Sequence, residues 1–451
     1  MLCALTSLLE WTVPTGIGAA AASPLLWRIA MENFDLRGTD DGSEFLLRAL
    51  TFNQWIQNNY YYPRILPNLY IGYGYPVFSF YSPISYFIIV LVELIGQATI
   101  ENSARIVMVL IPICGAIGIA RLTIDIIISM GFMVSTGRRA AISVIASSIY
   151  VGSPYPFVTN LMLRGDIPEA FALAIFPWLW ISVRHLLRDN ASLRADVIAR
   201  AGLLGALVIF LHQLSAVIFA ATMIFIIVSS IIYLRKQSSI NSLIFSALIA
   251  TGISSALWIP LIADQSYVRL SVLSHSVNEI SQKLGPTYQP IRIIWPYEYG
   301  WNLLIKLGPS GPILPSITQL LLLLSSIVIV SYFKKVYLYD IIIIIIVYWS
   351  LNLDLSKILW ENSSSIAIVQ FPWRLLGVIA LGIAVVFCVS IYLLNYKLIY
   401  ILAAVVPTVI WAESIGALAI PVRQDLQHGY SAEAMVADDY AFDRWGASTT
   451  T

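Results

Sequence analysis

Residues 214–234 read LSAVIFAATMIFIIVSSIIYL, a run without a charged side chain that is long enough to cross a bilayer as one helix. Residues 8–29 form a weaker run, interrupted by Glu10 and Pro14, which we interpret as the first crossing. The sequence therefore predicts an all-α polytopic membrane protein with about eleven transmembrane helices. The other apolar runs lie near 104–123, 140–159, 168–187, 198–212, 241–262, 313–333, 337–352, 374–394 and 398–419.

The composition also indicates a protein that lies in lipid. Of the 451 residues, 59% are hydrophobic and 11% are charged, and the mean hydropathy is +0.80. Soluble domains carry about 25% charged residues, because water solvates their surface. The net charge of +1 gives no indication of a nucleic-acid partner. Cys3, Cys114 and Cys388 lie apart in apolar runs, which indicates neither a disulfide framework nor a metal site.

Basic residues between the apolar runs predict the orientation of the chain. Cytoplasmic connections of membrane proteins are enriched in Lys and Arg, so the connections that carry them are expected in the cytoplasm. This places the protein in the cell membrane with a cytoplasmic N-terminus and an extracytoplasmic C-terminus. The basic connections hold Arg138 and Arg139, Arg184 to Arg200, Arg235 and Lys236, Lys334 and Lys335, and Lys397.

The same alternation divides the chain into parts. A transmembrane domain is expected over 1–419, with a first external loop at 30–103 and a second at 263–312. Residues 420–451 are expected to form an external tail. Residues 82–98, SPISYFIIVLVELIGQA, are short for a crossing, and a crossing there would invert the alternation of basic connections. We therefore predict that this segment is half-inserted or re-entrant at the outer surface.

The first external loop contains the most patterned polar stretch. Residues 35–83 read DLRGTDDGSEFLLRALTFNQWIQNNYYYPRILPNLYIGYGYPVFSFYSP, which is more than a connector requires. Asp40 and Asp41 precede an amphipathic segment, SEFLLRALTFNQWI, that is typical of a helix lying in the membrane interface. One aspartate could simply cap that helix. The other interpretation is that the pair acts in catalysis or holds a metal.

Two further groups of charged residues fall on the predicted extracytoplasmic side. In LMLRGDIPEAFA, Arg164 and Glu169 occupy a short turn together with Asp166, where charges are costly unless paired or hydrated. Arg164 and Glu169 either form an interfacial pair that fixes the hairpin, or Arg164 contacts an anionic headgroup while Glu169 orients the Arg164 side chain. In IVQFPWRLLG, Arg374 begins a helix, where its planar fork of donors suits phosphate. The alternative for Arg374 is an interface anchor shared with Trp373. His212 is assigned to helix packing rather than to catalysis.

Several of these blocks carry a resemblance to a known family. The run from DDGSEFLLRAL to YYPRILPNLYIGYGYPVFSFYSPISYF is followed by YVGSPYPFVTNLMLRGDIPEAFA, HQLSAVIF, LWIPLIADQSYVR and QFPWRLLG. This order resembles bacterial and archaeal membrane proteins labelled 6-pyruvoyl-tetrahydropterin synthase-related, which are similar to GT-C-type glycosyltransferases. The label implies pterin chemistry, but no residue pattern here supports it. The resemblance implies a GT-C-like bundle with an external active site.

Two features depart from that family. Relatives commonly carry a histidine where this chain has Glu44 and Phe45, and the chain stops at GASTTT, where relatives continue into an external domain. The chain is therefore expected to be a fragment or a shortened form. Both departures favour the alternative that it is a non-catalytic subunit or scaffold of a membrane complex. A lipid or polysaccharide transporter is the other alternative, although it would place polar groups at mid-membrane.

The resemblance implies a glycosyltransferase that moves a sugar from a polyprenyl-phosphate carrier to an unidentified acceptor on the extracytoplasmic face. Asp40 or Asp41 would act as general base or hold a divalent Mg or Mn ion. The donor phosphate would be bound by Arg374, Arg164 and Arg269. The supporting residues would be Glu169, Arg48, Tyr73, Tyr75, Tyr297, Glu298 and Gln370.

Overall fold

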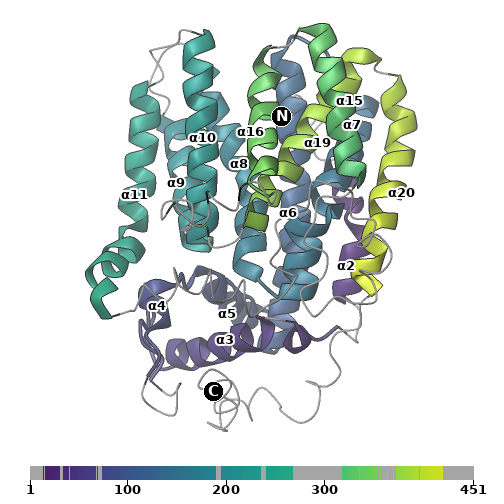
Figure 1. Cartoon of the computed structure of the whole chain (residues 1–451). Coiled ribbons are helices and arrows are strands. Elements are labelled where there is room, and N and C mark those ends of the chain that lie inside the picture. Colours follow the sequence, from purple (N-terminus) through teal and green to yellow (C-terminus); the bar gives the residue numbers. More distant parts are fainter. Residues whose placement is uncertain are drawn as a thin grey trace, which may run out of the picture.

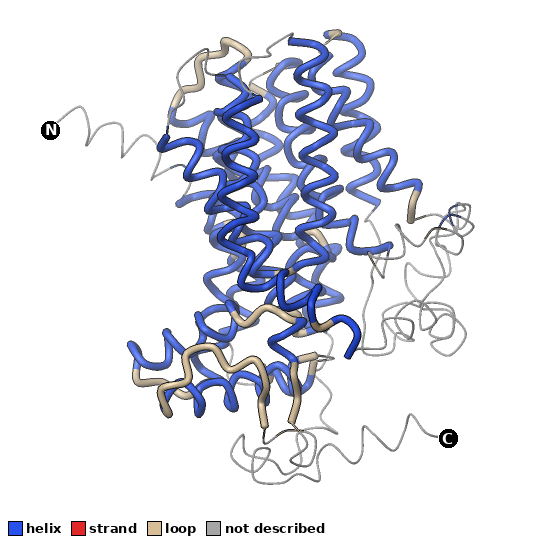
Figure 2. Tube along the Cα trace, turned by 90° about the vertical axis from the view of Figure 1, so that its left-hand side faces the viewer, coloured by secondary structure: helices blue, strands red, loops and turns tan. Residues whose placement is uncertain are grey.

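The computed structural model describes most of the apolar part of the chain. The described residues are 16–30, 34–39, 41–67, 74–188, 195–234, 240–267, 317–334, 336–352, 372–395 and 397–419, with a few single positions besides. Within these residues the fold is an elongated bundle of helices (Figures 1 and 2). The described residues form no strand; a single bridge pairs Leu66 with Tyr75.

The long helices coincide with the apolar runs that the sequence predicts as crossings. Five of them are long and apolar enough to span a membrane, or six if one bent pair counts as a single span. The chain is thus a multi-pass membrane protein, while the count of about eleven crossings stays a prediction. The helices are α2 Ser23–Ala30, α6 Ile100–Ser129, α7 Thr136–Gly152, α8 Ile167–Arg188, α9 Ala195–Leu211, α10 Gln213–Leu234, α11 Ile240–Ala263, α15 Ile317–Phe333, α16 Val336–Ser350, α19 Leu376–Leu394 and α20 Leu398–Ala419.

Helix α19 lies at the centre of the bundle. It packs against α6, α7, α15, α16 and α20, and its membrane-spanning window is fully buried. A helix that is apolar on every side fits such a position, because no face of it needs water. Gly377 allows close packing with α8, since a Cβ there would lie 2.4 Å from a methyl carbon of Leu173. The QFPWR block is therefore attached to the most enclosed helix that the structure describes.

One predicted crossing is broken. The run at 140–159 divides at Ser153, where α7 ends and the π-helix η2 Pro154–Arg164 begins at an angle of 47°. Pro154 and Pro156 lack the N–H groups that would continue the helical hydrogen bonds, so the bend has a local cause. The redirected η2 carries the chain to Arg164.

Three helices of the first loop lie together across one end of the bundle (Figure 1). They are α3 Gly42–Gln57, α4 Val77–Phe80 and α5 Ile84–Gly96. Aromatic contacts join all three: Phe45 stacks on Tyr86 at 4.5 Å, and Phe78 meets Phe52 and Tyr86 edge-on, each at 5.2 Å between ring centroids. The predicted helix in SEFLLRALTFNQWI is present as α3. The position of α5 beside α3 suits a segment that does not cross, and its half-insertion stays a prediction.

The two ends of the bundle differ in what they carry. Helix α6 leaves the end that holds α3 and α5, so the basic connection between α6 and α7 lies at the opposite end (Figure 1). The positive-inside rule assigns that opposite end to the cytoplasm.

Cysteine labelling tests this assignment. In a background with the native cysteines replaced by alanine, a membrane-impermeant maleimide should modify Tyr61→Cys from outside intact cells and spare Thr136→Cys. Both native side chains are exposed, so reactivity reports the side of the membrane rather than burial. Labelling of both positions after permeabilisation is the control. The reverse pattern would place α3 in the cytoplasm and contradict an extracytoplasmic site.

Candidate functional site

The turn between η2 and α8 holds three charged groups together. After Arg164 the chain passes through Gly165 with a φ of 71°, a left-handed conformation that glycine adopts without strain. The Asp166 carboxylate then accepts a hydrogen bond from the Glu169 backbone N–H at 3.1 Å and caps the first turn of α8. Because the turn is short, Arg164 can reach both carboxylates.

Arg164 binds its neighbours through both terminal nitrogens. Its Nη1 donates to Asn160 Oδ1 at 2.8 Å and to Glu169 Oε2 at 3.1 Å. Its Nη2 donates to Asp166 Oδ2 at 2.9 Å and lies 3.8 Å from a carboxylate oxygen of Asp41. The interfacial Arg–Glu pair that the sequence suggested is thus present, but it belongs to a larger network.

The first loop docks onto this turn through its backbone. The Asp41 N–H donates to the Arg164 carbonyl at 2.6 Å, and a Cβ on Gly165 would lie 3.0 Å from Gly42 Cα. Asp41 occupies the N-cap position of α3, yet its side chain makes no capping hydrogen bond. Its carboxylate instead faces Arg164 and remains 56% exposed. Helix capping therefore does not account for the Asp41 side chain.

Glu169 is the partner that Arg164 shares with Arg374. Only 1% of its side chain is exposed, and its Oε2 lies 3.3 Å from Arg374 Nε as well as 3.1 Å from Arg164 Nη1. The Tyr155 hydroxyl donates to the other oxygen, Oε1. Burying a carboxylate is strongly unfavourable unless cations and hydrogen-bond donors surround it, which these three groups do.

Arg374 lies just ahead of the central helix, close to the helix start at which the sequence predicted it. It lies in the short turn η7 Pro372–Leu375, directly ahead of α19. Its Nη1 donates to the Val369 carbonyl at 3.0 Å, and its side chain is 6% exposed. A simple interface anchor would leave the guanidinium at the surface, whereas this one is enclosed beside Glu169.

His212 joins the same cluster, although sequence analysis assigned it to helix packing. One ligand atom each from Asp166, Glu169 and His212 lie within 4.8 Å of one another, and all three residues are buried. His212 Nδ1 accepts a hydrogen bond from the Ser215 backbone N–H at 3.2 Å. In the neutral imidazole this leaves the proton on Nε2.

These three residues do not suit a divalent metal. The oxygens of Asp166 already accept from the Glu169 N–H and from Arg164, and those of Glu169 accept from Tyr155 and Arg164 and form an ion pair with Arg374. A metal ion would have to displace those donors and would then lie close to two guanidinium groups. Asp166 and Glu169 are better described as the anionic partners of Arg164 and Arg374.

A second cluster lies beside the first, around Arg48. Its Nη2 donates to Tyr75 OH at 3.0 Å and pairs with Glu44, and its guanidinium faces the rings of Tyr75 and Tyr81 at 5.3 and 5.7 Å. Burial lowers the pKa of Arg48, but Tyr86 and Glu44 outweigh this effect and leave the pKa raised. Burial raises the pKa of the Tyr81 phenol, and the Asp166 carboxylate raises it further. Tyr81 therefore faces Arg48 and lies close enough to Asp166 to be affected by its charge.

The structure therefore brings together Asp41, Arg164, Glu169 and Arg374, with Arg48 and Tyr75 alongside. The sequence patterns placed Tyr155 and Asp166 beside Arg164 but gave neither of them, nor His212, a functional role. Each is a polar residue at the edge of an apolar run, and that pattern was the available signal. Six predicted residues lie outside the described part of the chain: Asp40, Tyr73, Arg269, Tyr297, Glu298 and Gln370. The predicted metal site at Asp40 and Asp41 accordingly stays a prediction.

Comparison with known proteins gives a family match. A family model described as "6-pyruvoyl-tetrahydropterin synthase related domain; membrane protein" matches residues 78–305, which is half of the chain. No curated protein matches the chain. The matched part includes η2, α8 and His212, and so most of the charge network.

Proposed function

The chain belongs to the 6-pyruvoyl-tetrahydropterin synthase related family of membrane proteins, and we propose that it is a GT-C-like glycosyltransferase. It would move a sugar from a polyprenyl-phosphate carrier to an acceptor on the extracytoplasmic face. The observation that carries this proposal is the joining of Arg164 and Arg374 through Glu169, beside the half-exposed carboxylate of Asp41.

The paired arginines suit the phosphate of a lipid carrier. Arg164 comes from the end of η2 and Arg374 from the start of α19, so two separate elements supply guanidinium groups to one place. Their carboxylate partners fix the orientation of both groups before substrate arrives. Donors that are already aligned stabilise the charge that develops on a leaving phosphate without further reorganisation.

Asp41 is the general base in this proposal. Its carboxylate is 56% exposed, so an acceptor hydroxyl can approach it, and Arg164 lies 3.8 Å away. A carboxylate in its ionised form is the group that can accept the proton of that hydroxyl. The neighbouring Tyr75 and Tyr81, held by Arg48, offer aromatic rings for the faces of a sugar.

Sugar transfer by the purified protein tests the proposal. The protein in lipid nanodiscs would receive a radiolabelled sugar on a polyprenyl-phosphate carrier, with Mg²⁺, with Mn²⁺ or with EDTA. Transfer to water or to an added glycan supports the proposal, and a loss of transfer in EDTA supports a metal at the predicted Asp40–Asp41 pair. Carrier binding without transfer would favour a transporter.

The alternative of a non-catalytic scaffold has one observation in its favour. Every carboxylate oxygen of Asp166 and Glu169 already has a donor, as a purely structural network requires. A scaffold would neither transfer sugar nor bind the free carrier, polyprenyl phosphate. The binding measurement therefore separates this alternative from the other two.

Arg374→Lys should lower the affinity for polyprenyl phosphate by roughly ten- to a hundredfold, because lysine keeps the charge but loses the fork of donors. Binding of the labelled carrier to the purified variants would measure the effect. Arg139→Lys, at the opposite end of the bundle, is the matched control. Arg374→Ala is less informative, since it also removes one of the cations that Glu169 faces. Unchanged binding in Arg374→Lys would make Arg374 a structural group only.

A further inference from the structure

Charged side chains gather at the end of the bundle opposite α3, where α6 and α8 pack against each other. Asp125 of α6 is engaged there through both of its oxygens. Arg184 Nε of α8 donates to Oδ2 at 3.4 Å, and His185 Nε2 of α8 lies 3.3 Å from Oδ1. Arg184 Nη2 also donates to Ser129 Oγ at 3.0 Å. Neither the proposed transfer reaction nor the family comparison assigns a role to this group of residues.

Two further guanidinium groups come from α6 and α9. Arg121 lies one turn before Asp125 on α6 and interacts with it, and Arg200 lies in the second turn of α9. Arg200 is close enough for its charge to act unfavourably on Arg121. Like charges on neighbouring helices repel one another unless an anion lies near both. An added anion near Arg121 and Arg200 would therefore be stabilising.

The described side chains of α6, α8 and α9 at this end carry an excess of one positive charge. Three guanidinium groups lie there with two carboxylates, and protonation of His185 would increase the excess. A ligand with one negative charge would complete the balance. The guanidinium groups belong to Arg121, Arg184 and Arg200, and the carboxylates belong to Asp125 and Asp196.

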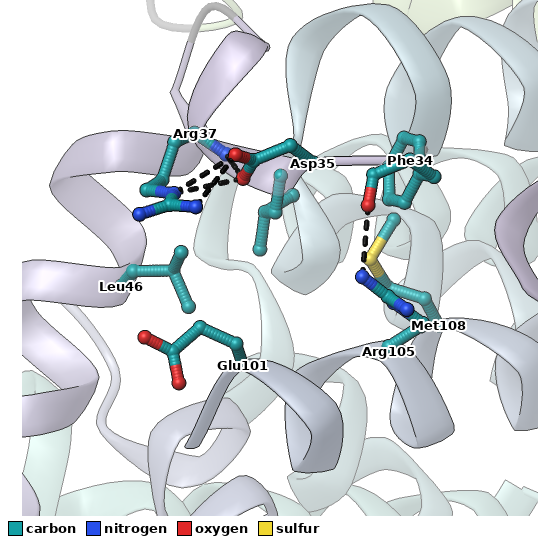
Figure 3. Close-up of a pocket in the computed structure, with 8 residues that line it drawn as sticks. Phe34, Asp35, Arg37, Leu46, Glu101, Arg105 and Met108 are labelled. Atoms are coloured by element: carbon teal, nitrogen blue, oxygen red, sulfur yellow. Dashed lines mark hydrogen bonds and ion pairs between the residues drawn. The ribbon is translucent and has the colours of Figure 1, made fainter. Parts of the chain in front are cut away.

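The other end of α6 differs in this respect. There Glu101 and Arg105 line a cavity of about 130 Å³ together with the ion pair of Asp35 and Arg37 (Figure 3). Glu101 also acts on Arg37, and Arg105 donates to the Phe34 carbonyl at 2.8 Å. Two cations and two carboxylates line that cavity, so their charges balance within the protein. We therefore expect an anionic ligand at the end of α6 that bears Arg121.

Arg121 lies at the depth of lipid phosphate groups. The apolar run at 104–123 is about 30 Å long as a helix, which matches the thickness of the hydrocarbon core. Arg121 is near the end of this run, and its long side chain can extend to the polar boundary. The guanidinium group is thus placed where the membrane itself supplies phosphate.

An apolar face leads from these cations toward the middle of the membrane. On α6, Ile106 and Leu110 are 44% and 53% exposed. They share a side of the helix with Arg121, because their distances of 15 and 11 residues from it are close to whole numbers of turns. On α9, Leu203 is 55% exposed and follows Arg200 by less than one turn. Both helices therefore continue from a cation into a face that lipid covers.

We propose that Arg121 and Arg200 bind the headgroup of a phospholipid that has one negative charge and no ammonium group, as in phosphatidylglycerol. The phosphate diester lies near both guanidinium groups and offsets their repulsion. The acyl chains run along the exposed faces of α6 and α9, past Leu110 and Leu203. This lipid site is independent of the proposed sugar transfer.

Other sources of phosphate match this site less well. Phosphatidylcholine and phosphatidylethanolamine carry an ammonium group beside the phosphate, which brings another positive charge to an end that already has an excess. A free phosphate ion has a suitable charge but no acyl chains to bury against Leu110 and Leu203. The site should therefore select an anionic lipid.

Native mass spectrometry of the full chain tests this selectivity. Protein released from nanodiscs with equal amounts of phosphatidylglycerol and phosphatidylcholine should retain the first about tenfold more, the scale of one charge-assisted hydrogen bond. Arg121→Gln and Arg200→Gln should each bring the ratio close to one. The matched control is Arg139→Gln at the same end of the bundle, where Arg139 Nε donates to the Val134 carbonyl. This variant should keep the native ratio.

Thermal unfolding provides a second measurement, whose sign depends on the lipid. In phosphatidylcholine alone, Arg200→Gln should be at least as stable as the native chain, because it removes the repulsion with Arg121. In phosphatidylglycerol the native chain should gain more stability than the variant, since it keeps both cations. An arginine that serves only in packing would instead lower stability in both lipids when replaced.

Each outcome decides the proposal. Equal retention of the two lipids by the native chain would overturn it without any variant. A native ratio in both Arg121→Gln and Arg200→Gln would also contradict it. An equal loss of preference in Arg139→Gln would show that the overall charge of this end attracts the lipid and that no specific site exists. Inorganic phosphate in large excess should leave the lipid bound, and displacement by it would make a soluble ion the ligand.

Discussion

Asp41→Asn is expected to abolish sugar transfer, with a loss of about 100- to 10,000-fold, while leaving the amount of folded protein unchanged. A positioned general base contributes an effect of that size, and the amide of asparagine cannot take up the proton. Stability should hardly change, because Asp41 is 56% exposed and its contact with Arg164 is long, at 3.8 Å. Transfer from the labelled carrier would be measured with purified protein.

Asp264→Asn is the matched control for this variant, since Asp264 follows α11 outside the charge network. Asp40→Asn would be assayed in parallel, because the sequence predicts that at least one of the two aspartates is essential. If both variants transfer sugar at the native rate, the aspartates are surface residues. The role of base would then have to be reassigned.

Glu169→Gln is expected to lower the free energy of unfolding by about 3–5 kcal/mol, the typical effect of removing one partner from a buried ion pair. The substitution keeps the volume of the side chain but leaves Arg164 and Arg374 facing a neutral amide in an enclosed site. Thermal unfolding of detergent-solubilised protein, followed by intrinsic tryptophan fluorescence, would measure the change.

The control for Glu169→Gln is Glu93→Gln on α5, which makes no ion pair within the described residues. It should not lower the unfolding temperature, because the Glu93 carboxylate has a buried oxygen without a hydrogen-bond partner. A Glu169→Gln variant as stable as the control would mean that water, and not Glu169, compensates the two arginines. The enclosed network that the proposed mechanism uses would then be incorrect.

Local sequence determined the helices and their polarity. Long apolar runs without charge can satisfy their backbone groups in lipid only as helices, so 104–123 and 374–394 predicted α6 and α19 directly. The Arg164–Glu169 pair could also be predicted from the sequence, because the two residues are only five positions apart on a tight turn. The broken span at Ser153 had a visible cause in Pro154 and Pro156, but hydropathy alone treated 140–159 as continuous.

Only the tertiary structure decided which distant groups meet. Arg374 faces Glu169, and His212 reaches the same cluster, because η7 and the α9–α10 junction lie against the start of α8. Apolar helices offer little in their sequences to specify such neighbours, since lipid tails and leucine side chains are equally apolar and association depends on detailed packing. Hydrophobic pattern therefore determined that this chain is a membrane helix bundle, and the packing of individual side chains determined where its charges converge.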